Sequence, residues 1–132
     1  MILEDYTLTS LATIGALFVY FYCMIQVGRA RFKYGVKPPS VDGPEEFQRI
    51  NRVHQNMLEQ LIMFFPALWL FAFAWGDLAA GILGAIFAIG RILYAQGYYK
   101  APEKRSSGFA VSSLTTIVLI LGALVGTVMA LL

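Results

Sequence analysis

Long apolar runs alternate with short polar segments along the whole chain. The first run, residues 8–28, contains no charged residue. The three later runs are residues 47–75, 78–100 and 109–132. A helix needs roughly 20 predominantly apolar residues to cross the hydrocarbon core of a bilayer. The pattern therefore predicts an all-α protein, a single integral membrane four-helix bundle formed by residues 1–132.

Proline, glycine and acidic residues mark the ends of the predicted helices. The second helix should begin at about Pro44 and end at Trp75. At 1.5 Å per residue that is ~48 Å, so its first turns should extend beyond the bilayer. Pro66 is expected to kink this helix. A tight turn at Gly76 should follow, with Asp77 as the N-cap of the third helix.

The placement of charge predicts the orientation of the bundle. Hydrophobic residues make up 58% of the chain and charged residues 14%, which excludes an ordinary soluble fold. All 10 lysines and arginines lie within Arg29–Arg52 and Arg91–Arg105, and residues 28–46 should form a basic, turn-rich connection. The opposite helix ends carry only Glu4, Asp5 and Asp77. Because basic residues stay cytoplasmic, both termini should lie outside and the two basic loops inside.

The second predicted helix carries a polar stripe inside an otherwise apolar run. At ~100° per residue, the helical period places Arg49, Arg52, Asn56 and Glu59 on one face. Glu59 should lie ~15 Å along the axis from Arg49, within the apolar slab. An ionisable residue at that depth is costly unless it is paired, so it indicates a functional site.

The third predicted helix carries a matching stripe. Arg91, Tyr94 and Tyr98 share one face at spacings i, i+3 and i+7. Because the two helices are antiparallel, Arg91 should lie at the same depth as Glu59, and we expect these two residues to form an ion pair. Two interpretations follow. The polar residues hold two helices together, or they form a ligand site.

An excess of guanidinium groups favours the ligand site. Five arginines cluster near one membrane level: Arg31, Arg49, Arg52, Arg91 and Arg105. They outnumber the carboxylates and suit a small zwitterionic ligand with more than one carboxylate, whose ammonium Glu59 could hold. Binding of anionic membrane lipids is the alternative for the basic residues of the first loop, but it explains the regular Arg52-Asn56-Glu59 stripe poorly.

Other chemistry is not indicated. Cys23 is the single cysteine, which excludes an internal disulfide, and it should be a small buried or lipid-facing side chain without a redox role. His54 has no metal-ligand spacing, so no metal site is expected. The chain has no Gly-rich phosphate loop, nucleophile elbow or CxxC motif, and no nucleic-acid partner is expected. Small residues at every fourth position on the last two helices should serve helix packing.

The two stripes together resemble the MAPEG family, membrane-associated proteins in eicosanoid and glutathione metabolism. The resemblance rests on Arg52-x-His54-x-Asn56-x-x-Glu59 and on Arg91-x-x-Tyr94-x-Gln96-Gly97-Tyr98, and it extends from Arg31 to Arg105. It implies a homotrimer that uses glutathione as co-substrate, a tripeptide with two carboxylates, an ammonium and a thiol.

The resemblance also implies a role for each matching residue. The glutathione-binding residues would be Arg31, Arg52, His54, Asn56, Glu59, Arg91, Tyr94, Gln96 and Tyr98. Sites in this family lie between subunits, so His54 could serve a neighbour's pocket. Arg105 matches the arginine that activates the thiol. The thiolate is the nucleophile, and a guanidinium beside the sulfur lowers the pKa of the thiol.

Departures from the family pattern narrow the expected activity. Leukotriene C synthase-like members have a tyrosine where this chain has Gln60, and adjacent arginines where it has Arg31-Phe32. The length is similar to that of bacterial, microsomal glutathione S-transferase-like members. We therefore expect a detoxifying glutathione transferase, with glutathione peroxidase activity, acting on lipophilic electrophiles from the bilayer. Its place would be a bacterial inner membrane, with the active site facing the cytoplasm.

Two other classes of function stay open from the sequence. A non-catalytic lipid-binding or scaffold protein of the same fold would bind no glutathione and would tolerate loss of Arg105. An ion or proton pathway would rest only on Glu59 and Arg91.

Overall fold

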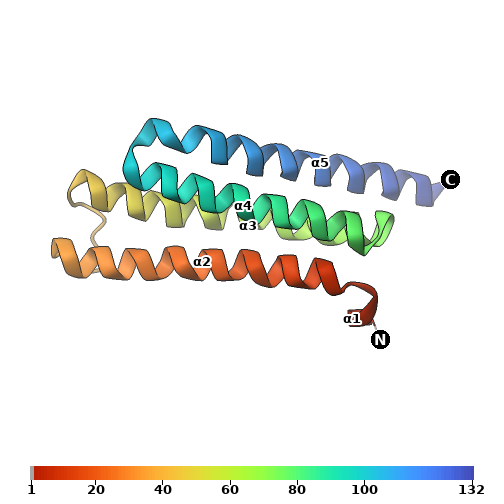
Figure 1. Cartoon of the computed structure of the whole chain (residues 1–132), viewed down its shortest axis with the longest axis horizontal. Helices are drawn as coiled ribbons and strands as arrows, with labels where there is room; N and C mark the ends of the chain where they lie inside the picture. The colour runs from red at the N-terminus through yellow and green to blue at the C-terminus, as the bar shows by residue number, and fades with distance from the viewer. Residues whose placement is uncertain (1) are drawn as a thin grey trace.

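The computed structural model describes residues 2–132 and shows a bundle of four long helices. The elements are α1 (Ile2–Asp5), α2 (Thr7–Tyr34), α3 (Glu45–Trp75), α4 (Asp77–Lys100), the 3-10 helix η1 (Pro102–Arg105) and α5 (Ser106–Leu131). The long helices lie side by side, and both termini are at the same end of the bundle (Figure 1). The predicted all-α, four-helix architecture is confirmed.

All four long helical segments meet the requirement for crossing a membrane. The spans are Thr7–Tyr34, Glu45–Trp75, Asp77–Lys100 and Pro102–Leu131, each long and apolar enough. Large apolar side chains cover the outside of the bundle, where lipid would solvate them as well as a protein core would. The chain is an integral membrane protein.

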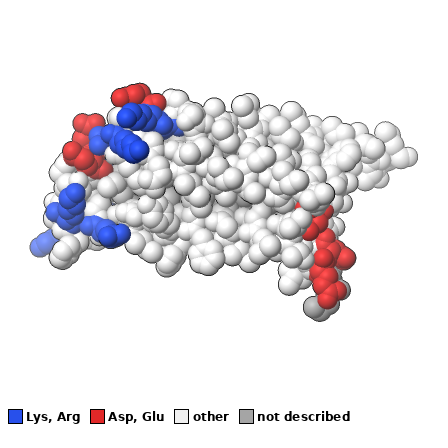
Figure 2. All heavy atoms as spheres, in the orientation of Figure 1, with Lys and Arg blue, Asp and Glu red and all other residues white. Residues whose placement is uncertain are grey.

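Lysine and arginine gather at one end of the molecule, as the sequence predicts. In the view of Figure 2 all the visible basic residues lie at the end where α2 stops, while the end with the termini shows only acidic ones. The long basic side chains can extend from helix ends to the aqueous interface.

The first connection is shorter than the sequence indicates. Residues 28–34, expected in a turn-rich connection, continue α2 as far as Tyr34. The helix stops only at Gly35, whose φ of 67° is left-handed and whose backbone N–H donates to the carbonyl of Arg31. Pro44 is the N-cap of α3, not its first helical residue, and α3 runs unbroken through Pro66.

The predicted role of Asp77 as the N-cap of its own helix is wrong. Asp77 is the first residue of α4, whose N-cap is Gly76, without a side-chain cap. The Asp77 carboxylate instead accepts the backbone N–H groups of Leu8 (2.9 Å) and Thr9 (2.7 Å) and the Thr9 hydroxyl (2.8 Å). These N–H groups belong to the first turn of α2, which has no intrahelical partners for them. Asp77 therefore caps a neighbouring helix.

Aromatic and small side chains pack the bundle core. The rings of Phe64 and Phe87 stack with centroids 3.7 Å apart between α3 and α4. A Cβ atom on Gly84 would meet Ala12 of α2, and one on Gly126 would meet Ala74 of α3. The small-residue stripes therefore bring helices of the same chain together.

Candidate functional site

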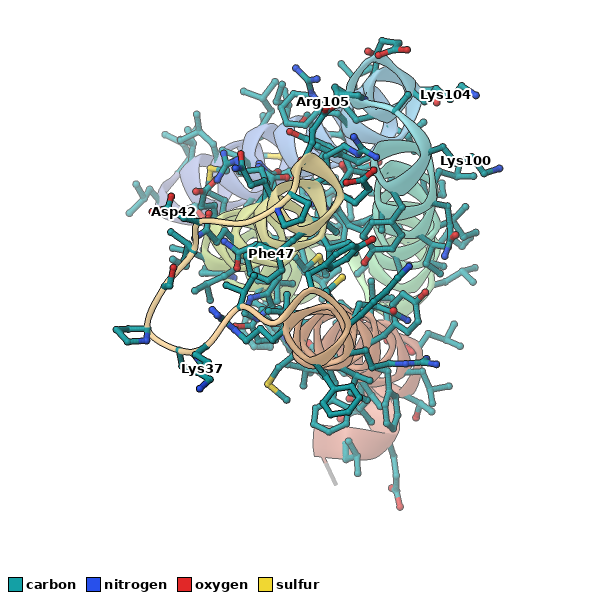
Figure 3. The ribbon with its side chains drawn as sticks, turned by 90° about the vertical axis from the view of Figure 1, so that its left-hand side faces the viewer. Lys37, Asp42, Phe47, Lys100, Lys104 and Arg105 are labelled. Carbon is teal, nitrogen blue, oxygen red and sulfur yellow. The ribbon has the colours of Figure 1, made fainter. Side chains whose placement is uncertain are left out.

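A polar cavity opens at the end of the bundle that carries the basic residues. Its volume is about 580 Å³, and it lies between α3, α4 and the η1–α5 junction. Nine residues line it: Arg52, Asn56, Glu59, Gln60, Tyr94, Tyr98, Arg105, Ser106 and Phe109. Figure 3 looks onto this end of the molecule, where the labels of Lys104 and Arg105 mark η1. The structure thus brings together six of the residues predicted from sequence.

The α3 wall of the cavity is a connected set of polar side chains. Arg52 donates to both carboxylate oxygens of Glu59, with Nη1 to Oε1 at 2.9 Å and Nη2 to Oε2 at 3.2 Å. Asn56 donates from Nδ2 to Glu59 Oε2 at 3.3 Å. These residues are three, four and seven positions apart, so two turns of one helix place them on one face. The carboxylate is thereby oriented while about half of the Glu59 side chain stays exposed.

The structure does not contain the ion pair predicted between Glu59 and Arg91. Arg91 is only 1% exposed and reaches Asn56 instead, donating from Nη2 to Oδ1 at 2.7 Å. It also contacts Met57 Sδ at 3.4 Å and Ser112 Oγ at 3.5 Å, and it lies 4.2 Å from the Tyr94 ring centroid. Equal depth is not sufficient for a pair, because the Asn56 side chain lies between the two charged groups.

Arg91 therefore lies behind the cavity wall and does not line it. Within residues 2–132 no carboxylate lies within salt-bridge distance of its guanidinium. Its direct contacts are with neutral groups and an aromatic face, and the Glu59 carboxylate acts on it at longer range. Its positive charge adds to the potential inside the cavity.

The opposite wall is built where η1 and α5 come close to α4. A Cβ atom on Gly97 would collide with the Lys104 carbonyl, and one on Gly108 would collide with the backbone of Tyr94. The two glycines therefore allow the backbones to approach. The Arg105 guanidinium carbon consequently lies 5.4 Å from the Tyr98 ring centroid.

The cavity carries an excess of positive charge. Two guanidinium groups line it, those of Arg52 and Arg105, and Arg91 lies directly behind. Glu59 is the single carboxylate among the lining residues. These four side chains leave a net charge of +2, which favours a ligand with a net negative charge and several carboxylates.

The sequence matches a known family. The sequence model of the MAPEG family matches residues 9–125, which is most of the chain. The chain belongs to the MAPEG family. Membership agrees with the resemblance seen in the two polar stripes.

Several proteins are similar to this MAPEG chain over most of their length. An uncharacterised protein of Synechocystis is 53% identical over 117 residues, 89% of this chain and 82% of that protein. Human microsomal glutathione S-transferase 2 is 40% identical over 104 residues, 78% of this chain and 71% of the human protein. Bovine leukotriene C4 synthase is 28% identical over 123 residues, 93% of this chain and 82% of the bovine protein.

Three predicted site residues of this MAPEG chain lie away from the cavity. Arg31 donates to the carbonyls of Val36 and Ser40 in the first loop. His54 faces α2, where its ring stacks on Tyr20 at 5.1 Å. Gln96 donates to the Tyr22 hydroxyl at 3.3 Å. The cavity of a single MAPEG chain is therefore formed without them.

Three of the lining residues have no site role predicted from the sequence: Gln60, Ser106 and Phe109. Gln60 follows Asn56 by four positions, so the helical period of the stripe could have indicated it. Ser106 and Phe109 carry no such signal, because the polar stripes end before α5 begins.

A second polar groove adjoins the cavity on the loop side. Its volume is about 480 Å³, and it shares Arg52 and Tyr98 with the first cavity. Asp42 and Glu45, from the loop and the start of α3, also line it. The two cavities therefore adjoin at Arg52 and Tyr98, and the second one extends the polar surface of the site towards the first loop.

Proposed function

We propose that this MAPEG protein is a membrane-bound glutathione transferase that conjugates glutathione to lipophilic electrophiles. The observation that carries the proposal is the cavity with net charge +2, in which a half-exposed carboxylate is held between Arg52 and Asn56. The similarity to proteins named microsomal glutathione S-transferase 2 supports the same class of activity.

Glutathione has charged groups that complement this cavity. The guanidinium of Arg52 would bind a carboxylate, and the oriented Glu59 carboxylate would bind the ammonium. With its thiol ionised, the tripeptide carries two carboxylates, a thiolate and one ammonium, so its net charge of −2 balances the cavity. Tyr94 and Tyr98 add phenolic groups at the α4 wall.

Arg105 is the residue proposed to activate the thiol. Its side chain is held to the cavity rim by a 2.7 Å hydrogen bond from Nη1 to the Pro102 carbonyl and by the Tyr98 ring. A guanidinium beside sulfur favours the thiolate and lowers the pKa of the thiol. The thiolate then attacks an electrophilic carbon, forming the C–S bond while the leaving group departs with the electron pair of its own bond.

The lipophilic substrate would come from the bilayer. Phe109 lines the cavity from the first turns of α5 and is 42% exposed. Its ring therefore provides an apolar surface where the cavity meets the lipid-facing side of the bundle. Lipid hydroperoxides are a second proposed substrate class. The thiolate attacks the distal peroxide oxygen and the O–O bond breaks, releasing an alkoxide that takes a proton to become the alcohol; a second glutathione thiol then converts the sulfenic acid to the disulfide and water.

We also propose a homotrimer in which Arg31, His54 and Gln96 serve the cavity of a neighbouring subunit. These residues carry the family pattern, yet they lie outside their own chain's cavity. The subunit number can be measured by native mass spectrometry in detergent. A monomer that binds glutathione and conjugates it to the electrophile would contradict this assembly.

The transferase is tested with the full chain purified in detergent, glutathione and 1-chloro-2,4-dinitrobenzene. Arg105→Ala should lower kcat by about tenfold to a hundredfold, the range expected when a charge that stabilises the reacting anion is lost. The matched control is Lys104→Ala, because Lys104 neighbours Arg105 and does not line the cavity.

The outcomes separate the alternatives. Equal turnover of Arg105→Ala and wild type would remove Arg105 from the mechanism. Wild-type protein that neither binds nor turns over glutathione would favour the scaffold, and measurable ion flux in proteoliposomes would favour the pathway. Parallel assays with cumene hydroperoxide test the peroxidase activity.

A further inference from the structure

Gln60 is a largely buried residue whose amide lines the cavity and forms no hydrogen bond with another residue of the described range 2–132. The residue is 8% exposed, and its side chain forms part of the cavity wall. Among the residues that the structure describes, none forms a hydrogen bond with its side chain. Its neighbours further along α3, Leu61 and Phe64, belong to the apolar core.

An amide in a cavity wall can bind a ligand there when no protein group occupies its donors and its acceptor. The Gln60 amide has two N–H donors and one carbonyl acceptor, and the cavity lies beside it. It is therefore suited to a neutral, oxygen-bearing group of a ligand.

The position of Gln60 indicates which ligand that is. Gln60 is eight residues beyond Arg52 on α3, ~12 Å along the helix axis. Arg52 lies at the loop side, where the second groove begins, so Gln60 lines the end of the cavity deeper in the membrane. The charged groups for the tripeptide end at Glu59. The amide therefore lies on the bilayer side of these charged contacts, the side from which an apolar substrate would approach them.

We propose that Gln60 is a specificity-determining residue that donates a hydrogen bond to the carbonyl oxygen of lipophilic α,β-unsaturated carbonyl compounds. This assignment rests on the proposed transferase function. The thiolate forms a C–S bond at the β-carbon, and the electron pair of the C=C bond moves to leave an enolate on the carbonyl oxygen. The Gln60 N–H stabilises that oxygen, and a proton from solvent then reaches the α-carbon, replacing the proton lost by the thiol.

The test compares two electrophiles on the full chain in detergent. trans-2-Nonenal has a carbonyl oxygen, whereas benzyl chloride has no hydrogen-bond acceptor of that kind. Gln60→Met preserves the length of the side chain and removes both donors. It should lower kcat/KM for trans-2-nonenal by about tenfold or more. The kcat/KM for benzyl chloride should stay within about twofold of the wild-type value, and the KM for glutathione should not change.

Two further variants make the comparison decisive. Gln60→Leu also removes the N–H donors and adds no charge, so it should show the same selective loss if Gln60→Met does not fold. Gln26→Met is the matched control, because Gln26 lies on α2 and outside the cavity. Its ratio of kcat/KM for trans-2-nonenal to kcat/KM for benzyl chloride should equal that of wild type.

The results distinguish this assignment from the proposed function. Equal losses for both electrophiles, a raised KM for glutathione, or no loss in the Gln60 variants would overturn the assignment alone. Wild-type protein that conjugates neither electrophile would overturn the proposed transferase and this assignment with it.

Discussion

At the scale of single residues, Arg91 shows how a buried charge can act through a neutral neighbour. Its Nη2 group donates to Asn56 Oδ1, which leaves the Asn56 Nδ2 group directed at Glu59. An amide that is held at its oxygen cannot rotate freely, so the nitrogen is presented to the carboxylate. We therefore propose that Arg91 is a positioning residue, which acts on the cavity through Asn56.

Replacement of Arg91 tests this role. Arg91→Met should weaken glutathione binding by about tenfold, because Asn56 loses the donor that orients it and the cavity loses one positive charge. Isothermal titration of the folded variant measures the Kd. Arg29→Met, which changes an exposed arginine outside the cavity, is the control. An unchanged Kd for a well-folded Arg91→Met would leave Arg91 with a packing role only.

At the scale of elements, the close approach of η1 to α4 decides where Arg105 lies. Gly97 faces the Lys104 carbonyl, and Gly108 faces the backbone of Tyr94. A side chain at either position would separate the two backbones. The backbone around the short 3-10 helix can therefore pack directly against α4 because Gly97 and Gly108 have no side chains.

This packing predicts the effect of a single added methyl group. Gly97→Ala should lower kcat with 1-chloro-2,4-dinitrobenzene by about tenfold, because the new Cβ would push η1 and Arg105 away from the Tyr98 ring. Gly28→Ala is the matched control, since no atom lies within 4 Å of a Cβ there. A fully active Gly97→Ala would show that the η1 position does not control turnover.

At the scale of the whole molecule, the separation of charge between the two ends supports a single orientation. The lysines and arginines are confined to the end with the first loop and η1, while both termini lie at the opposite end. We propose that the basic end and the site face the cytoplasm. Soluble glutathione would then enter from water and the electrophile from lipid.

Cysteine labelling tests the orientation in a Cys23→Ala background, which removes the single native thiol. In right-side-out spheroplasts a membrane-impermeant maleimide should label Ala79→Cys, near the start of α4. Lys37→Cys, in the first loop, should react only after permeabilisation. Both positions are exposed, so the opposite labelling pattern would reverse the proposed topology.

The local pattern of the sequence was sufficient for the four helices and for one face of the site. Hydrophobic run length identifies spans because each span satisfies its own backbone hydrogen bonds in lipid. The helical period likewise placed Arg52, Asn56 and Glu59 on one face, because neighbours on a helix surface depend only on spacing. The predicted end of α2 was too early: basic residues outside the bilayer are compatible with a helix, which continues to Tyr34 and stops at Gly35.

Only the tertiary structure decided which groups meet between helices. Glu59 pairs with Arg52 and Arg91 with Asn56, and the Asp77 carboxylate caps α2. Such contacts depend on the rotation and depth of each helix against its neighbour, which a period along one helix does not contain. The same reason explains why Ser106 and Phe109 of α5 could not be assigned to the cavity wall from sequence.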